Sequence, residues 1–236
     1  MSALDSALRA KLTEAPVAGL STQLRRLGIH GATIDGLRSL APGSKVVGLA
    51  KTLRYVPLRE DLFAERGGGQ NAQKRAFDAL EPGEVVVIEA RGQVDAGTLG
   101  DILALRAQTL GAAGIVTDGA VRDFATVAAL GIPVFAAGPH PAVLGRRHVP
   151  WESDTTIACG GATVQPGDVI VGDSDGLVVI PPHLAEEVAD RTLAQEREDA
   201  WIAARVTEGV PLDGLFPLNE SWRAVFDAET EREADS

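Results

Sequence analysis

Between residues 84 and 135 the sequence alternates strand-length apolar runs with segments of helical spacing. The run Val85-Val86-Val87-Ile88 is continuous and apolar, which is typical of a strand buried on both faces of a sheet. Glycine and proline punctuate the units. The predicted elements are strands at 84–90, 114–117 and 132–135 and helices at 97–110 and 121–130. Because strands that alternate with helices pair in parallel, this part of the chain predicts an α/β fold.

The flanking segments predict different structure. Leucines at helical spacing predict helices within about 2–28, a Val- and Leu-rich stretch predicts a strand at 45–56, and the triple glycine 67–69 predicts a loop before a helix at 71–80. After Pro150 the predicted strands are short and joined by tight turns, at 155–159, 163–165, 168–171 and 177–180. A long amphipathic helix and a tail follow over about 183–236.

Together these elements predict one domain, 1–236, with helices around a mixed sheet in an α/β/α sandwich rather than a barrel. It combines mixed sheets and late antiparallel hairpins with peripheral N- and C-terminal helices. The apolar tail at 211–217 is too short to form its own core, so we expect it to dock onto a neighbour, such as another subunit.

Composition narrows the classes of partner. The 236 residues carry a net charge of −11, which repels phosphate backbones and anionic lipid headgroups, so we expect no nucleic acid and no membrane partner. No apolar run reaches the length of a membrane-spanning helix. Cys159 is the single cysteine, and the start lacks the pattern of a secretory signal. A soluble, cytoplasmic protein is the expectation.

The candidate catalytic and binding residues lie at the starts of two predicted helices. The string Gly100-Asp101-Ile102-Leu103 opens one helix, and Gly119-Ala120-Val121-Arg122-Asp123 opens the next. Unpaired N–H groups at two such starts that face one cleft would bind a carboxylate. Arg122 would hold a carboxylate and a keto oxygen through its planar fork, and Asp123 offers a hard oxygen ligand for a divalent cation. The commoner reading of an Arg-Asp pair is a helix cap with a surface ion pair.

The motif resembles a known family. GDIL, a helix and then GAAGIVTDGAVRD resemble the signature of the family of 4-hydroxy-4-methyl-2-oxoglutarate/4-carboxy-4-hydroxy-2-oxoadipate aldolases and regulator of ribonuclease activity A. The likeness extends from about Leu20 to about Trp201 and includes VQPGDVIVGDSDGLVVIP. It implies a class II pyruvate aldolase with the fold of an αββα sandwich, with Mg²⁺ or Mn²⁺ and no organic cofactor, assembled as a homotrimer or homohexamer with sites at subunit interfaces.

The resemblance also assigns roles. Asp123 is the direct metal ligand, Arg122 the substrate clamp, and Asp101 orients a metal-bound water as proton relay. The N–H groups of Ile102 and Leu103, next to Gly100, hold the pyruvyl carboxylate. A carboxylate from an adjacent subunit's C-terminal helix completes the site, with Glu198 as first candidate and Glu196 as second.

We therefore expect a lyase that cleaves a small 4-hydroxy-2-oxo acid to pyruvate and also decarboxylates oxaloacetate. Two alternatives stay open: a non-catalytic binding protein like the ribonuclease regulator, and a dehydratase or decarboxylase of a sugar-derived 2-oxo acid. The spacing of the four histidines disfavours a zinc site. The segment 53–69, with Arg54, Arg59 and Arg66, either tunes substrate choice or forms surface ion pairs.

Overall fold

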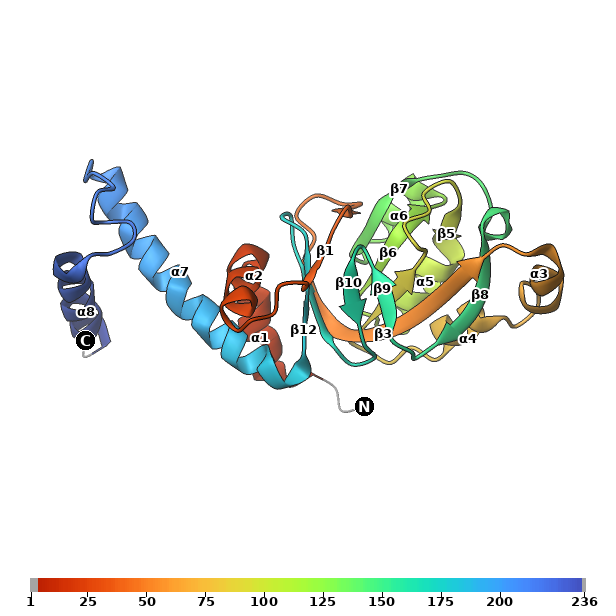
Figure 1. Ribbon diagram of the computed structural model, residues 1–236, viewed down its shortest axis with the longest axis horizontal. Helices are drawn as coiled ribbons and strands as arrows, with labels where there is room; N and C mark the ends of the chain where they lie inside the picture. The colour runs from red at the N-terminus through yellow and green to blue at the C-terminus, as the bar shows by residue number, and fades with distance from the viewer. Residues whose placement is uncertain (1–3, 235–236) are drawn as a thin grey trace.

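The computed structural model describes residues 4–234, so positions 2–3 and 235–236 of the expected terminal segments lie outside it. One mixed sheet dominates the fold (Figure 1). Its ten strands run in the order β1-β12-β11-β3-β4-β6-β7-β2, with β5 added to β6 and β8 to β3. Their bounds are β1 Thr33–Ile34, β2 Arg38–Ser39, β3 Val46–Pro57, β4 Glu84–Glu89, β5 Gly97–Leu99, β6 Gly114–Val121, β7 Val134–Pro139, β8 His148–Ser153, β11 Val169–Gly172 and β12 Leu177–Ile180.

Pairing within the sheet changes along the chain as expected. Strands β3, β4, β6 and β7 pair in parallel, and β5 is also parallel to β6. The late strands β11 and β12 form an antiparallel hairpin, and a separate antiparallel pair consists of β9 (Ile157–Cys159) and β10 (Ala162–Val164). The sequence-based α/β prediction with late hairpins is confirmed.

Three apolar cores give the αββα layering. The helices α4 (Ala72–Asp78), α5 (Asp101–Thr109) and α6 (Phe124–Ala129) cover one face of the parallel strands. Side chains on the other face of those strands meet β11, β12 and the β9–β10 pair. The outer face of β11 and β12 packs against α1 (Ser6–Glu14), α2 (Val17–Arg26) and α7 (Ala185–Thr207). Val85 and Val87 therefore point to one core while Val86 and Ile88 point to another, as the period of two in a strand requires.

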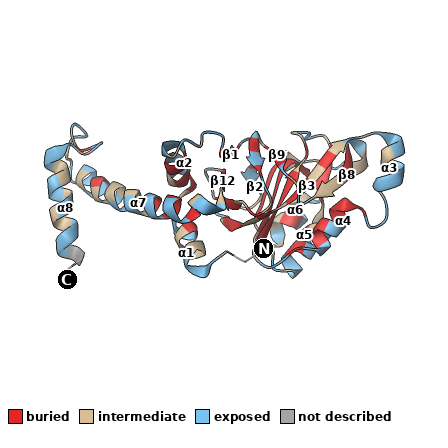
Figure 2. Ribbon diagram, turned by 60° about the horizontal axis from the view of Figure 1, so that its bottom comes forward, coloured by how far each residue is buried: buried red, intermediate tan, exposed pale blue. Residues whose placement is uncertain are grey.

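The C-terminal part extends away from the layers as an arm. Helix α7 packs through its first half on α1 and α2, and its second half continues outward to α8 (Glu220–Ala234) (Figures 1 and 2). Trp201 of α7 stacks edge-on with Trp222 and Phe226 of α8. Aromatic packing thus holds α8 against α7. Among the described helices, none joins the length to the apolar character that crossing a bilayer demands.

Several elements differ from the sequence-based expectations. Residues 97–99 form strand β5 instead of the first turn of a helix, and residues 119–121 end strand β6 instead of opening the next helix, which begins at Phe124. Helix α3 (Glu60–Arg66) and the short strands β1 and β2 were not predicted. Helix α8 was not predicted. Strand β8 was missed because it contains Pro150, which the structure accommodates beside an irregularity in the pairing of β3 with β8.

Candidate functional site

Asp123 lies at the start of α6 in an unusual backbone conformation. Its φ of 54° is left-handed, and its side chain does not cap the helix. Its exposed carboxylate forms no hydrogen bond or ion pair with any residue of the described chain. A Cβ built on Gly100 would lie 2.8 Å from Asp123 Oδ2, so the carboxylate occupies space that glycine leaves open. Asp123 is therefore the N-cap residue of α6 by position, but its side chain makes no capping hydrogen bond.

Arg122 directly follows strand β6. The Arg122 N–H donates to the Leu99 carbonyl at 2.9 Å, which joins β6 to the end of β5. Its aliphatic stem lies against Gly97, where a Cβ would collide with Cγ and come within 3.0 Å of Cδ. The Nε atom is buried and has no hydrogen-bond partner, and no ion pair involves the guanidinium within residues 4–234. The surface ion-pair reading is wrong, and a buried donor remains for a ligand.

Gly100 and Asp101 form the facing helix start. Gly100 is the N-cap of α5 in an extended conformation, and Asp101 is its first helical residue. Asp101 Oδ1 accepts a hydrogen bond from the Ile102 N–H at 2.8 Å. A bound carboxylate would have to displace this contact to use the Ile102 N–H as expected. Ile102 itself is 71% exposed, so the helix start opens to the surface.

The donor set fits a hard divalent cation bound largely by water and substrate. Asp123 supplies a free carboxylate in a cradle that a glycine keeps open, and Mg²⁺ is commonly held by one or two carboxylates together with water. Within the described residues no group of three or more His, Cys, Asp or Glu side chains gathers as a metal cage. This donor set suits Mg²⁺ or Mn²⁺ better than a structural zinc ion.

The sequence of this chain matches a known protein family over most of its length. The family model RraA-like, described as Aldolase/RraA, matches residues 10–179. The chain belongs to the RraA-like family.

Several relatives are close in sequence and structure. A protein of Halalkalibacterium halodurans named "Putative 4-hydroxy-4-methyl-2-oxoglutarate aldolase" is 34% identical over 75% of this chain and 82% of its own length. The crystal structure of RraAS2 from Streptomyces coelicolor, "an unusual member of the RNase ES inhibitor RraA protein family", is 34% identical, covers 85% of this chain and 98% of that chain, and has a TM-score of 0.78. An uncharacterized protein from Pseudomonas syringae pv. tomato is 28% identical over 92% of this chain and 96% of its own, with a TM-score of 0.81.

In this RraA-like chain, Glu198 is held by its own C-terminal arm. Arg223 of α8 donates to both carboxylate oxygens of Glu198, at 2.7 and 2.9 Å. Glu196 lies nearby, where burial and then the charge of Asp199 raise its pKa. Both glutamates line a cavity of about 540 Å³ between α2, α7 and the tail. Since α7 leads away from α5 and α6, neither glutamate meets Asp123 of the same chain (Figure 1).

The arginines of residues 53–69 are engaged locally. Arg59 pairs with Asp61, Arg54 lies within 3.5 Å of Glu89 and Glu152, and Arg66 stacks over Trp151 at 4.1 Å. Arg66 also lies 3.5 Å from Glu65, so the surface ion-pair alternative describes all three arginines.

Sequence reasoning missed the buried polar residues behind the site. Tyr55 of β3 donates to the Thr98 carbonyl at 3.0 Å, Gln73 of α4 donates to Tyr55 Oη at 2.7 Å, and Thr98 Oγ1 donates to the Ala120 carbonyl at 2.9 Å. This network fixes β5 immediately before Gly100. Burial raises the Tyr55 pKa far above its usual value, so the hydroxyl keeps its proton. No spacing in the sequence links these residues.

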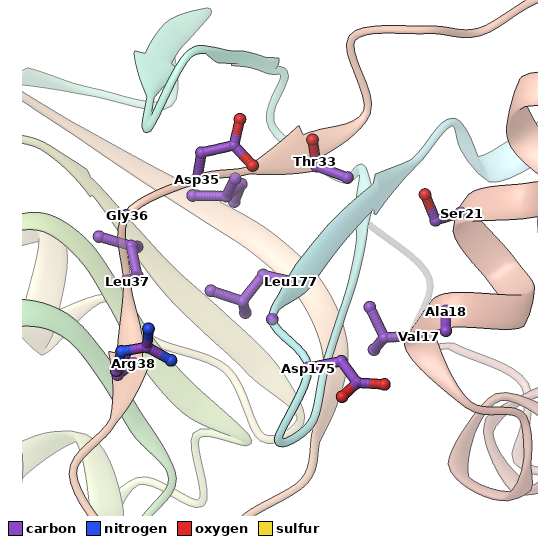
Figure 3. Close-up of a pocket in the computed structure, with 12 residues that line it drawn as sticks. Val17, Ala18, Ser21, Thr33, Asp35, Gly36, Leu37, Arg38, Asp175 and Leu177 are labelled. Carbon is purple, nitrogen blue, oxygen red and sulfur yellow. The ribbon is translucent and has the colours of Figure 1, made fainter.

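A cavity elsewhere in the structure lies away from Asp123 and Arg122. Figure 3 shows a cavity of about 340 Å³ between α2, β1 and the turn that precedes Leu177, lined by charged groups that include Asp35, Arg38 and Asp175. None of the predicted site residues lines it.

Proposed function

We propose that this RraA-like protein is a divalent-metal-dependent lyase that cleaves a 4-hydroxy-2-oxo acid to pyruvate and a second oxo acid. The observation that carries the proposal is the pair of unpartnered, oppositely charged groups, Asp123 and Arg122, against the glycines of the facing segment. The buried Nε of Arg122 has no partner, which is costly unless a ligand uses it, and the exposed carboxylate of Asp123 is free to bind a cation. Relatives named as putative aldolases support the same chemistry.

Each residue has a role in this proposal. Arg122 grips the 1-carboxylate and 2-oxo group of the substrate, and the first N–H groups of α5, from Ile102 and Leu103, hold the carboxylate against the positive helix end. Asp123 is the ligand of the cation. A bound Mg²⁺ or Mn²⁺ supplies Lewis-acid stabilisation of negative charge on the 2-oxo group. Asp101 carries the proton between the 4-hydroxyl and carbon 3 as the bond between carbons 3 and 4 breaks.

Oxaloacetate decarboxylation follows from the same residues. Loss of carbon dioxide leaves the same pyruvate enolate, so the grip of Arg122 stabilises both reactions. Decarboxylation needs no base for a 4-hydroxyl proton. We therefore expect Asp101→Asn to slow the aldol cleavage more than the decarboxylation.

The proposed enzyme is a homotrimer or homohexamer in which Glu198, or Glu196, completes the site of a neighbouring subunit. The exposed approach to Asp123 and the outward direction of α7 support a shared site (Figure 1). Mixing an inactive Asp123→Asn protein with an inactive Glu198→Gln protein tests this arrangement. Recovered activity after subunit exchange supports a shared site, whereas no recovery with either glutamate variant refutes it.

Pyruvate release is the direct test of the function. Purified protein with Mg²⁺ or Mn²⁺ is assayed on a panel of 4-hydroxy-2-oxo acids and on oxaloacetate, beside Asp123→Ala and Arg122→Ala. The matched control is Asp154→Ala, because Asp154 is also left-handed, with φ of 58°. The proposal fails if the wild type releases no pyruvate from any substrate.

A second candidate function is inhibition of a ribonuclease by protein contact. It is favoured by the likeness to RraAS2, whose family is described as an RNase ES inhibitor family. Such a protein would slow RNA cleavage by its partner equally well as wild type and as Asp123→Ala. That result, together with no pyruvate release, would replace the lyase proposal.

A further inference from the structure

Asp118 is a buried carboxylate that holds a turn between β4 and β5. It is 7% exposed, and its two oxygens accept hydrogen bonds from the Ala90 N–H and, at 2.9 Å, from the Gly92 N–H. Arg91 and Gly92 have φ of 60° and 65°, and the Gln93 N–H donates to the Ala90 carbonyl at 3.1 Å. Two successive left-handed residues form a concave nest of N–H groups that suits an anion. Asp118 is that anion.

The turn also orients Arg91, which is half-buried, toward Arg147 and His148. Arg91 Nη2 donates to the Arg147 carbonyl and lies 3.0 Å from His148 Nδ1, although arginine rarely adopts a left-handed backbone. This strain persists only because contacts on both sides maintain it. On the side that faces β6, the turn is held by the carboxylate of Asp118.

Contacts continue without a gap from Asp118 to the candidate site. A Cβ on Gly119 would lie 2.5 Å from Thr98 Cγ2 and 2.7 Å from Ala90 Cβ, so this glycine lets β6 approach the connecting segment closely. The next links are the bonds from Thr98 Oγ1 to the Ala120 carbonyl and from the Arg122 N–H to the Leu99 carbonyl. Both ends of the segment from Ala90 to Leu99 thus lie against β6, and the side chain of Arg122 packs on Gly97.

We infer that Asp118 is a positioning residue: by closing the turn at Ala90–Gln93, it places Gly97 and so aims the guanidinium of Arg122. This inference rests on the proposed function for its kinetic consequence. The structural part stands independently, because it concerns the backbone that carries Arg122. A displacement of about 1 Å in a substrate-gripping group costs up to roughly 100-fold in rate.

The test compares Asp118→Asn with Asp168→Asn. An Asn at 118 keeps one acceptor but turns an NH₂ group toward a main-chain donor, which opens the turn. Asp168 is a matched control, since its carboxylate also accepts a turn N–H, from Gln165 at 2.8 Å, and burial raises the pKa of both Asp118 and Asp168. We expect Asp118→Asn to lower kcat for pyruvate release at least tenfold, whereas Asp168→Asn leaves it within twofold, both measured with the protein fully folded.

Amide hydrogen exchange separates this inference from the proposed function. In Asp118→Asn the Arg122 amide, which is bonded to Leu99, should exchange at least tenfold faster, and in Asp168→Asn it should not change. If the wild type releases no pyruvate, the lyase proposal fails and the exchange result alone decides the inference. Unchanged exchange at Arg122, or an equal loss of kcat in both variants, would overturn it.

A second pair of variants covers failure of Asp118→Asn to fold. Gly92→Ala strains the same turn, yet nothing lies within 4 Å of the added Cβ. Gly28→Ala is its control, with φ of 85° and equally open surroundings. Faster exchange at Arg122 in Gly92→Ala but not in Gly28→Ala supports the inference, and equal behaviour of the two contradicts it.

Discussion

The carboxylate of Asp123 lies against Gly100 so closely that a methyl group on the glycine would come within 2.8 Å of Oδ2. The two residues begin α6 and α5, which follow the neighbouring parallel strands β6 and β5. A glycine whose added methyl group would displace the carboxylate therefore borders a carboxylate without a partner in the described chain. This juxtaposition makes the site testable by substitutions that leave the charged residues in place.

Gly100→Ala should impair cation binding and pyruvate release without unfolding the protein. The backbone at Gly100 is extended, with φ of −136°, so alanine introduces no dihedral strain, but its methyl group displaces the Asp123 carboxylate. We expect Mn²⁺ affinity, measured by titration calorimetry, to fall roughly tenfold, or about 1.4 kcal/mol. Gly31→Ala, with no atom within 4 Å of its added Cβ, is the control. Equal Mn²⁺ affinities of Gly100→Ala and Gly31→Ala would contradict a cation site formed by Asp123 beside Gly100.

Asp123→Asn should abolish most of the activity while leaving the stability of the protein nearly unchanged. The Asp123 side chain forms no bond within the described chain, and asparagine tolerates the left-handed region, so the free energy of unfolding should change by less than about 0.5 kcal/mol. Pyruvate release should fall by roughly 100-fold or more, since the amide loses the negative charge that holds a cation. Thermal unfolding and steady-state kinetics measure both. A large loss of stability would mean that Asp123 is structural.

Arg122→Lys should weaken substrate binding although the charge is retained. Lysine lacks the planar fork that grips a carboxylate through two parallel bonds. We expect kcat/KM to fall roughly 30-fold, equivalent to about 2 kcal/mol. Arg106→Lys on α5 is the matched control, because that arginine forms an exposed pair with Asp78. A lysine variant with wild-type kcat/KM would show that the fork is not used.

The sequence predicts the helix starts of the candidate site better than the neighbouring strand and hydrogen bonds that hold them in place. That Gly100 and Asp123 lie near the starts of two helices is a pattern that periodicity and glycine punctuation reveal. The strand β5 escaped prediction because three residues carry too little periodicity, and its hydrogen bonds to Tyr55 and Gln73 link distant parts of the chain.

Long-range pairs between polar residues were equally hidden. The bond between Glu198 and Arg223 depends on where the turn after α7 directs α8, and no local pattern specifies it. The turn at Arg91 depends on a left-handed arginine, which sequence patterns assign to glycine. Such features arise from tertiary contacts that override local preference.

His148 should make the stability of the protein depend on pH. The ring is fully buried beside Tyr55, and burial, followed by the charge of Arg91, lowers the pKa of His148 to about 4; Asp95 raises it and Arg147 lowers it further. The unfolded chain binds this proton below about pH 6.5, so the folded state loses stability as pH falls from 6.5 toward 4. Between pH 7.5 and 5 we expect a loss of about 2 kcal/mol from this residue, measured by urea unfolding. His148→Asn, whose amide oxygen accepts from Arg91, should remove that part of the pH dependence. An identical pH slope in wild type and variant would show that another group is responsible.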